Sequence, residues 1–372
     1  MNNNICMPDY SNSILGIPNS ILAHFGAEPR HATLPVLDAE LQKGYRNVVL
    51  LAFDGLGIDA LKAHAPGGFL DSHCAGQISS VYPCTTVTAL TTLETGLEPI
   101  EHGWLGWSMY FQELGKCVDL FSGRESGAER PAAPISIAWN VIGYKNLLAQ
   151  INETDASVEC CRVSPFGSGY WVDTNEAICK HIGALCKKDG RRYIWAYHFQ
   201  PDKDMHECGC YSERVKADIV LFDAQIERLA SGLTDTLLII TADHGMADIV
   251  DLVVEDYPEI GECLAVPPNR EPLSLSFFIK PGYMDEFPER WAKHFGNDFL
   301  LMTGEETLQK GFFGTGVPHA RAAGFLGDYI ALATGNRALW YRNEKGEANN
   351  FKACHAGLLP CEMNVPLILI GI

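Results

Sequence analysis

Apolar residues in this chain gather in short runs that are separated by longer amphipathic or polar segments. The runs cover residues 48–53, 78–81, 192–199, 236–241 and 365–370. Such runs are typical of strands that are buried on both faces of a parallel sheet. Segments with helical spacing lie between them, at 85–93, 175–187 and 213–229. This alternation predicts an α/β fold with a mostly parallel central sheet.

Two features refine this prediction. The helix at 213–229 carries an apolar stripe that we expect to face the sheet, made of Ala217, Val220, Leu221 and Ala224. From residue 248 to about 326, acidic loops, a short strand at 273–279 and an aromatic segment interrupt the alternation. We expect residues 248–326 to form an inserted cap within a single domain spanning 1–372, and a strand at 327–333 to restore the pattern.

Three of the predicted strands end in an aspartate. Asp54, Asp202 and Asp243 each stand just past an apolar run, where open α/β sheets bind their ligands. His206 follows Asp202 by four residues and His244 follows Asp243 directly, so both imidazoles lie close enough to share an ion with a carboxylate. Each aspartate could instead cap a helix. Three such positions with two neighbouring histidines favour a metal site.

Two hydroxyls open the helix predicted at 85–93. Thr85 and Thr86 would meet unpaired backbone N–H groups and the positive end of the helix dipole, which favour an alkoxide and a phosphate alike. Either threonine could also be a simple helix cap. Trp104 and Trp107 follow in a glycine-rich loop, where each is either a core residue or part of a substrate pocket.

Composition narrows the class of protein. The chain has 372 residues, a formal net charge of −18 and 28 Lys and Arg residues, which argues against binding to a nucleic-acid polymer. An anionic substrate would need local positive charge, for which bound metal ions are the favoured source. Thirteen cysteines without a pairing pattern, and no C-x2-C spacing among them that would indicate zinc, suit a reducing cytoplasm. The polar first thirteen residues and the short apolar runs predict no signal peptide and no membrane span.

Five ordered motifs resemble the alkaline phosphatase superfamily, and within it the type I phosphodiesterase / nucleotide pyrophosphatase family. They are the strand ending in Asp54, the Tyr-Pro-x-x-Thr pattern at 82–86, Pro-Asp-x-x-x-His at 201–206, Ala-Asp-His-Gly at 242–245, and His-x-Gly at 355–357. The resemblance runs from residue 47 to the C-terminus. It implies an alkaline phosphatase-like, three-layer αβα sandwich around the central sheet.

The resemblance also implies a site. One ion of a two-zinc centre would be held by Asp202, His206 and His355, and the other by Asp54, Asp243 and His244. The nucleophile of the family pattern corresponds to Thr86, which would also ligate metal, with Thr85 as the alternative. Thr85 and Trp107 are the candidates for substrate binding. Imidazole and carboxylate suit Zn²⁺, and Mn²⁺ is the alternative ion.

The implied activity is hydrolysis of a phosphodiester or pyrophosphate bond in a small phosphorylated substrate through a phospho-threonine intermediate. Nucleotide-hydrolysing relatives carry an aromatic residue after the nucleophile and an asparagine about twenty positions later, where this chain has Val87 and Trp107. The choice between a nucleotide and another substrate therefore stays open. The motif at 84–88 lacks the Pro and Arg of sulfatases. A phosphomonoesterase or phosphonate-ester hydrolase on the same ions, and a metal-binding protein without turnover, are the alternatives. The oligomeric state is not predicted.

Overall fold

The central sheet is the scaffold of the molecule. The computed structural model describes residues 5–165 and 172–372. In spatial order the strands are β2 (Cys74–Ser79), β17 (Asn364–Gly371), β8 (Thr236–Ala242), β1 (Asn47–Phe53), β7 (Arg192–His198) and β6 (Glu159–Val163). β1 is parallel to β7 and β8, and β6 is parallel to β7, whereas β17 is antiparallel to β8 and β2. The mostly parallel sheet predicted from the sequence is confirmed.

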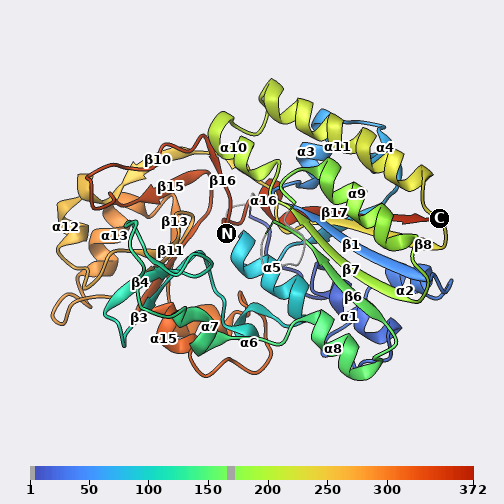
Figure 1. The fold of residues 1–372 in the computed structure, drawn as a ribbon. Helices are drawn as coiled ribbons and strands as arrows, with labels where there is room; N and C mark the ends of the chain where they lie inside the picture. Colours follow the sequence, from blue (N-terminus) through green and yellow to red (C-terminus); the bar gives the residue numbers. More distant parts are fainter. Residues whose placement is uncertain (1–4, 166–171) are drawn as a thin grey trace.

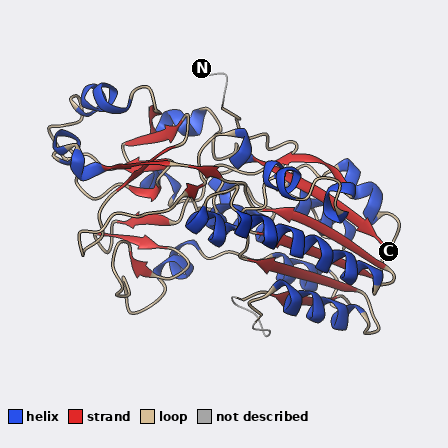
Figure 2. Ribbon diagram, turned by 90° about the horizontal axis from the view of Figure 1, so that it is seen from above, coloured by secondary structure: helices blue, strands red, loops and turns tan. Residues whose placement is uncertain are grey.

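Helices cover both faces of this sheet, as Figures 1 and 2 show. One layer contains α3 (Ile58–His64), α4 (Phe69–Ser72), α9 (Asn175–Cys186), α10 (Asp202–Cys208) and α11 (Glu213–Ser231). The opposite layer contains α1 (Gly16–His24), α2 (Pro35–Leu41), α5 (Thr86–Thr95) and α8 (Leu147–Thr154). Every residue of β1 and β8 is buried. Each buried Val, Leu or Ile in them contributes about 1.5–3 kcal/mol of transfer free energy, so the strands that carry the site are held firmly.

The prediction of which face of α11 is buried is wrong. Ala217, Val220, Leu221 and Ala224 are all exposed. The buried residues of the helix are Val215, Ile219, Phe222, Ile226, Leu229 and Ala230. Positions 215, 219, 222, 226 and 229 also have helical spacing, and they carry the larger side chains. The Phe222 ring stacks on that of Phe53 at 5.1 Å, so burial of the larger apolar area set the orientation of the helix.

A second lobe lies beside the central sheet (Figure 1). Its sheet runs in the order β13 (Phe299–Thr303), β14 (Tyr329–Ala333), β12 (Ser274–Phe277), β11 (Asn269–Glu271), β3 (Ser108–Phe111), β4 (Lys116–Asp119) and β5 (Arg124–Glu125). The expected strand at 327–333 therefore forms, but in this second sheet and antiparallel to β12 and β13. Because β3, β4, β5 and β14 come from outside 248–326, the predicted cap supplies only part of the lobe, and its bounds stay a prediction.

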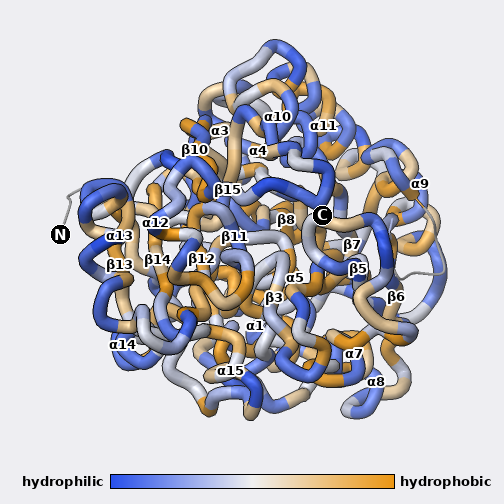
Figure 3. Tube along the Cα trace, turned by 90° about the vertical axis from the view of Figure 1, so that its left-hand side faces the viewer, coloured by the Kyte–Doolittle hydropathy of each residue, from blue (hydrophilic) through white to orange (hydrophobic). Residues whose placement is uncertain are grey.

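Short elements complete the second lobe and join it to the central sheet. The helices are α6 (Pro99–His102), α7 (Ile137–Ile142), α12 (Pro258–Gly261), α13 (Phe287–Phe295), α14 (Gly304–Gln309), α15 (Ala322–Leu326) and α16 (Pro360–Met363), with a 3₁₀ turn at Val254–Asp256. Two strand pairs remain, β10 (Val250–Val253) with β15 (Arg337–Trp340), and β9 (Ala247–Asp248) with β16 (Ala353–Cys354). Along the trace, hydrophobic segments lie mainly inside and hydrophilic loops outside (Figure 3). In the described residues we find no helix whose length and apolar character would let it cross a bilayer.

Candidate functional site

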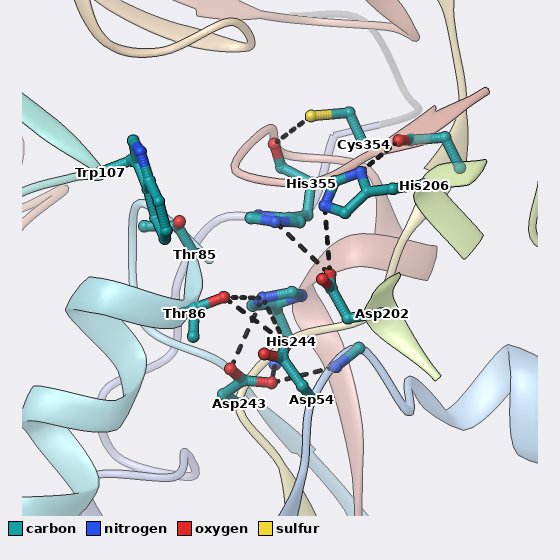
Figure 4. Close-up of polar contacts among 12 residues, drawn as sticks. Asp54, Thr85, Thr86, Trp107, Asp202, His206, Asp243, His244, Cys354 and His355 are labelled. Atoms are coloured by element: carbon teal, nitrogen blue, oxygen red, sulfur yellow. Dashed lines mark hydrogen bonds and ion pairs between the residues drawn. The ribbon is translucent and has the colours of Figure 1, made fainter. Parts of the chain in front are cut away.

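The predicted ligands converge at the carboxyl end of the central sheet (Figure 4). Asp54 follows β1, Asp202 opens α10 after β7, and Asp243 and His244 follow β8. Gly55, with φ of 73°, turns the chain sharply after β1. A Cβ atom at Gly55 would lie 3.0 Å from the Cα of Asp202, so only glycine lets the two aspartate loops approach this closely.

One group of donors contains Asp202, His206 and His355. Asp202 Oδ1 lies 3.4 Å from His206 Nε2 and 3.6 Å from His355 Nε2. Ligands bound tetrahedrally at zinc distances are separated by about 3.4 Å. The three side chains that the sequence assigned to one ion are therefore brought together at the spacing such an ion requires.

A second group contains Asp54, Asp202 and His244. His244 Nε2 lies 3.3 Å from Asp54 Oδ1 and 3.6 Å from Asp243 Oδ2. The assignment from the sequence placed Asp54, Asp243 and His244 together and kept Asp202 apart. The structure brings all four close, and it places Asp202 in both groups, so this carboxylate lies between the two halves of the cluster.

Several buried polar atoms of the cluster lack a hydrogen-bond partner within the described part of the chain. They are Asp202 Oδ1, Asp243 Oδ2 and His355 Nδ1. Burial, and then the charges of Asp202 and Asp243, raise the pKa of Asp54 well above its ordinary value, and burial also raises that of Asp243. Burial and the neighbouring His244 and His206 lower the pKa of His355. Buried carboxylates without counter-charge are costly, and divalent cations would supply that charge, so this donor set fits metal.

Backbone and side-chain contacts orient the ligands. His206 Nδ1 lies 2.7 Å from the carbonyl oxygen of Ala353, and His244 Nδ1 lies 2.9 Å from that of Gly245. Because a carbonyl only accepts, each Nδ1 carries the proton and each Nε2 presents a lone pair to the cluster. Tyr197 donates its phenolic proton to Asp54 Oδ2. Asp243 Oδ1 accepts from the backbone N–H groups of Gly55 and His244 at 3.1 and 2.9 Å.

Thr86 is the first residue of α5, and its hydroxyl faces the cluster. Its Oγ1 lies 3.4 Å from Asp54 Oδ1 and 3.3 Å from His244 Nε2. Thr85, the N-cap residue, is fully buried, and its hydroxyl donates to Glu271 Oε1 at 2.6 Å. The two hydroxyls therefore point to different partners, and only that of Thr86 meets the predicted metal ligands. Substrate binding by Thr85 stays a prediction, which this geometry does not favour.

Glu271 is a residue of the site that sequence reasoning missed. Its Oε1 also accepts from the backbone N–H of Trp107 at 2.7 Å. Burial raises the pKa of Glu271 to about 7, although its hydrogen bonds oppose the rise. Tyr197 was missed as well. Nothing in the local sequence marks either residue, since Glu271 lies on β11 of the second lobe and Tyr197 lies inside an apolar strand.

A cavity of about 620 Å³ opens in front of Thr86, between the cluster and the second lobe. The predicted residues Thr86, Trp107, Asp202, His206 and His355 line it. Trp107 is 43% exposed, whereas Trp104 is fully buried. Of the two tryptophans that the sequence left open, Trp107 can therefore meet a ligand and Trp104 is a core residue. The cavity is large enough for a small organic phosphate.

Comparison with known families gives a match that covers more than half of the chain. The family model for type I phosphodiesterase / nucleotide pyrophosphatase matches residues 48–147 and 152–267. These ranges contain every candidate ligand except His355. No curated protein sequence matches the chain at a significant level.

Solved structures share the fold. Murine ectonucleotide pyrophosphatase / phosphodiesterase 5 aligns with a TM-score of 0.67 at 17% identity, covering 87% of this chain and 88% of that one. An inactive variant of the murine protein in complex with AMP aligns with a TM-score of 0.65 at 16% identity, covering 87% of each chain. Phosphonoacetate hydrolase from Sinorhizobium meliloti 1021, in complex with phosphonoformate, gives a TM-score of 0.64 at 15% identity over 88% of this chain and 90% of that one.

Proposed function

Because this chain belongs to the type I phosphodiesterase / nucleotide pyrophosphatase family and is a phosphoric ester hydrolase, we propose that it cleaves phosphodiester or pyrophosphate bonds of a small substrate through a phospho-threonine intermediate. The observation that carries the proposal is the position of Thr86. Its hydroxyl stands at the N-terminus of α5 and within 3.4 Å of Asp54 Oδ1 and 3.3 Å of His244 Nε2. A nucleophilic hydroxyl and a cluster of metal donors thus share one cavity.

The family is metal-dependent, and the donor set supports a centre of two divalent ions. In this proposal Asp202, His206 and His355 would hold one ion, and Asp54, Asp243 and His244 would hold the other. Asp202 belongs to both groups of donors. Mixed imidazole and carboxylate donors favour Zn²⁺, with Mn²⁺ as the alternative. When bound, the ions would supply Lewis-acid stabilisation of the Thr86 alkoxide and of the phosphoryl oxygens.

The residues of the chain then act in order. The Thr86 hydroxyl loses its proton to solvent, and its Oγ1 attacks phosphorus in line with the leaving oxygen. The new bond joins Oγ1 to phosphorus, while the bond from phosphorus to the leaving oxygen breaks and that oxygen takes up a proton. Backbone N–H groups at the start of α5 favour the negative charge of the phosphoryl group. A water oxygen then bonds to phosphorus and the bond between phosphorus and Oγ1 breaks. One proton of the water passes to Oγ1, which restores Thr86, and the other leaves to solvent as the phosphorylated product departs.

We infer the substrate class from the net charge of the chain and from the size of the ligands in the compared structures. The chain has a net charge of −18, so it would repel a polymer of phosphates but can admit one small phosphoryl group to a cation centre. AMP and phosphonoformate, which the compared structures contain, are ligands of this size. A phosphomonoester or phosphonate ester is the alternative substrate. We place the enzyme in the cytoplasm, because its thirteen cysteines are all free.

Rapid quenching tests the proposal. The zinc-loaded enzyme is mixed with bis-p-nitrophenyl phosphate, quenched in acid and digested for mass spectrometry. We expect a p-nitrophenyl phosphate adduct on the peptide that contains Thr86 and faster turnover of this diester than of p-nitrophenyl phosphate. A clear preference for the monoester would favour the alternative activity, and hydrolysis without any adduct would contradict the covalent intermediate.

A further inference from the structure

One buried side-chain amide that lines the cavity has no hydrogen-bond partner within the described residues. Asn269, on β11, is 3% exposed, and neither its Oδ1 nor its Nδ2 makes a hydrogen bond there. The residue nevertheless lines the cavity that contains Thr86, His206 and His355. Leaving an amide donor and acceptor unpaired in a buried place is costly, and native structures rarely do so. The Asn269 side chain is therefore available to form hydrogen bonds with a ligand that enters the cavity.

The backbone around Asn269 is held in an unusual conformation. Arg270, the next residue, has φ of 82°, a region that non-glycine residues rarely adopt. Its guanidinium donates to the hydroxyls of Ser274 and Ser276 and lies 4.9 Å from the centre of the Phe313 ring. Packing around Arg270 thus fixes β11 and directs this cation to the interior of the lobe. Strain of this kind persists only where the surroundings impose it, and it is common at ligand sites.

The lining of the cavity indicates which chemical groups would satisfy Asn269. Among the described lining residues, Arg270 is the only Lys or Arg, and its guanidinium is turned to the interior of the lobe. Glu271 and Glu347 add two carboxylates that are not candidate metal ligands. Asn343, Asn349 and Asn350 also line the cavity, together with several aromatic residues. An anion could accept from Asn269 Nδ2 but would leave Oδ1 unpaired, and it would share the cavity with both carboxylates. A group with hydroxyl or N–H donors would pair with Oδ1, and its own oxygens would accept from Nδ2.

We propose that Asn269 is a specificity-determining residue that binds the organic group of the substrate, and that this group is an uncharged or cationic one bearing hydroxyl or amine donors. This inference rests on the proposed function and narrows it to phosphodiesters of donor-bearing alcohols. A bond between two phosphates fits less well, because the second phosphate would be an anion without donors. Trp107, with its exposed ring at the rim of the cavity, offers an apolar face to the carbon skeleton of such a group.

Matched p-nitrophenyl phosphodiesters test the inference on the zinc-loaded enzyme. Their second ester group is glyceryl, propyl or 2-carboxyethyl, so they differ in hydroxyl donors and charge but share one chromophore. For the wild type we expect kcat/KM to be highest for glyceryl and lowest for carboxyethyl. Asn269→Ala should lower kcat/KM about tenfold for the glyceryl ester and leave the propyl ester nearly unchanged, since one neutral hydrogen bond is lost. Asn140→Ala, at an exposed asparagine on α7, is the control.

Two outcomes would overturn the inference. One is an unchanged ratio of glyceryl to propyl turnover in Asn269→Ala, which would mean that water alone satisfies the carboxamide. The other is a wild-type preference for the carboxyethyl ester. If the wild type hydrolyses none of the three esters, the proposed function fails, and the inference is then decided by calorimetric binding of glycerol phosphate against propyl phosphate. Tighter binding of glycerol phosphate that Asn269→Ala abolishes supports it, and equal binding refutes it.

Discussion

The hydroxyl oxygen of Thr86 lies 3.3 Å from Nε2 of His244, although 158 residues separate them in the sequence. The contact joins the start of α5, in one helical layer, to the segment that follows β8 of the central sheet. This contact places the Thr86 hydroxyl, which can attack phosphorus, beside side chains that can bind cations.

Thr86→Ala should lower kcat by about a thousand-fold or more, because it removes the nucleophile. Zinc content, measured by mass spectrometry of the dialysed protein, should stay near that of the wild type, since the carboxylates and imidazoles remain. Thr91→Ala is the control, as Thr91 lies on the same helix and its hydroxyl donates to the Val87 carbonyl at 2.7 Å. Retained activity in Thr86→Ala would point to Thr85 or to direct attack by water.

Asp243→Ala should remove one of the two ions and most of the activity. Asp243 is fully buried, and its Oδ2 has no hydrogen-bond partner in the described residues, so its loss removes a donor that no other side chain replaces. The measurement is the ratio of zinc to protein, which should fall from about two to about one. Asp189→Ala, at an exposed site, should keep both ions. An unchanged ratio in Asp243→Ala would count against the ligand assignment.

Tyr197→Phe tests the support behind Asp54. The phenol donates to Asp54 Oδ2 from inside β7, and loss of such a contact behind a metal ligand typically lowers metal affinity or activity about 10–100-fold. We expect zinc to dissociate from the variant at lower chelator concentrations, while circular dichroism shows the same fold. The same chelator dependence in both proteins would show that Asp54 is held in place without Tyr197.

Glu362→Gln should change how stability depends on pH. Glu362 is buried and accepts from the N–H groups of Gly357 and Leu359, which follow His355. Burial raises the pKa of Glu362 from 4.5 to about 7. The folded state therefore binds this proton more tightly than the unfolded chain does, and ionising Glu362 lowers the free energy of unfolding as pH rises from about 4.5 to about 7.

The size of this effect follows from linkage. A shift of this extent corresponds to about 3 kcal/mol of unfolding free energy, which is lost as the pH rises between those two values. Urea unfolding of the metal-free wild type should show this loss between pH 4.5 and 7 in addition to the contributions of other groups, whereas Glu362→Gln should lack it. Parallel pH profiles for the two proteins would contradict the raised pKa.

The sequence by itself determined the fold class and the identity of the candidate ligands. Runs of apolar residues can be recognised locally because a strand buried on both faces must be apolar throughout, and Asp54, Asp202 and Asp243 stand just past such runs. His206 and His244 lie within one turn of an aspartate, so short spacing was enough to propose them. The family motifs added His355 and Thr86.

Only the tertiary structure decided how these parts meet. Which face of α11 is buried depended on Phe53 of another element, and the sharing of Asp202 by both donor groups depended on the turn at Gly55. β14 joined the second sheet because its partners, β12 and β13, lie there. Glu271, Tyr197 and Asn269 carry no local signal. Their roles come from contacts between segments far apart in the chain, and such contacts exist only after the hydrophobic core has set the positions of the strands.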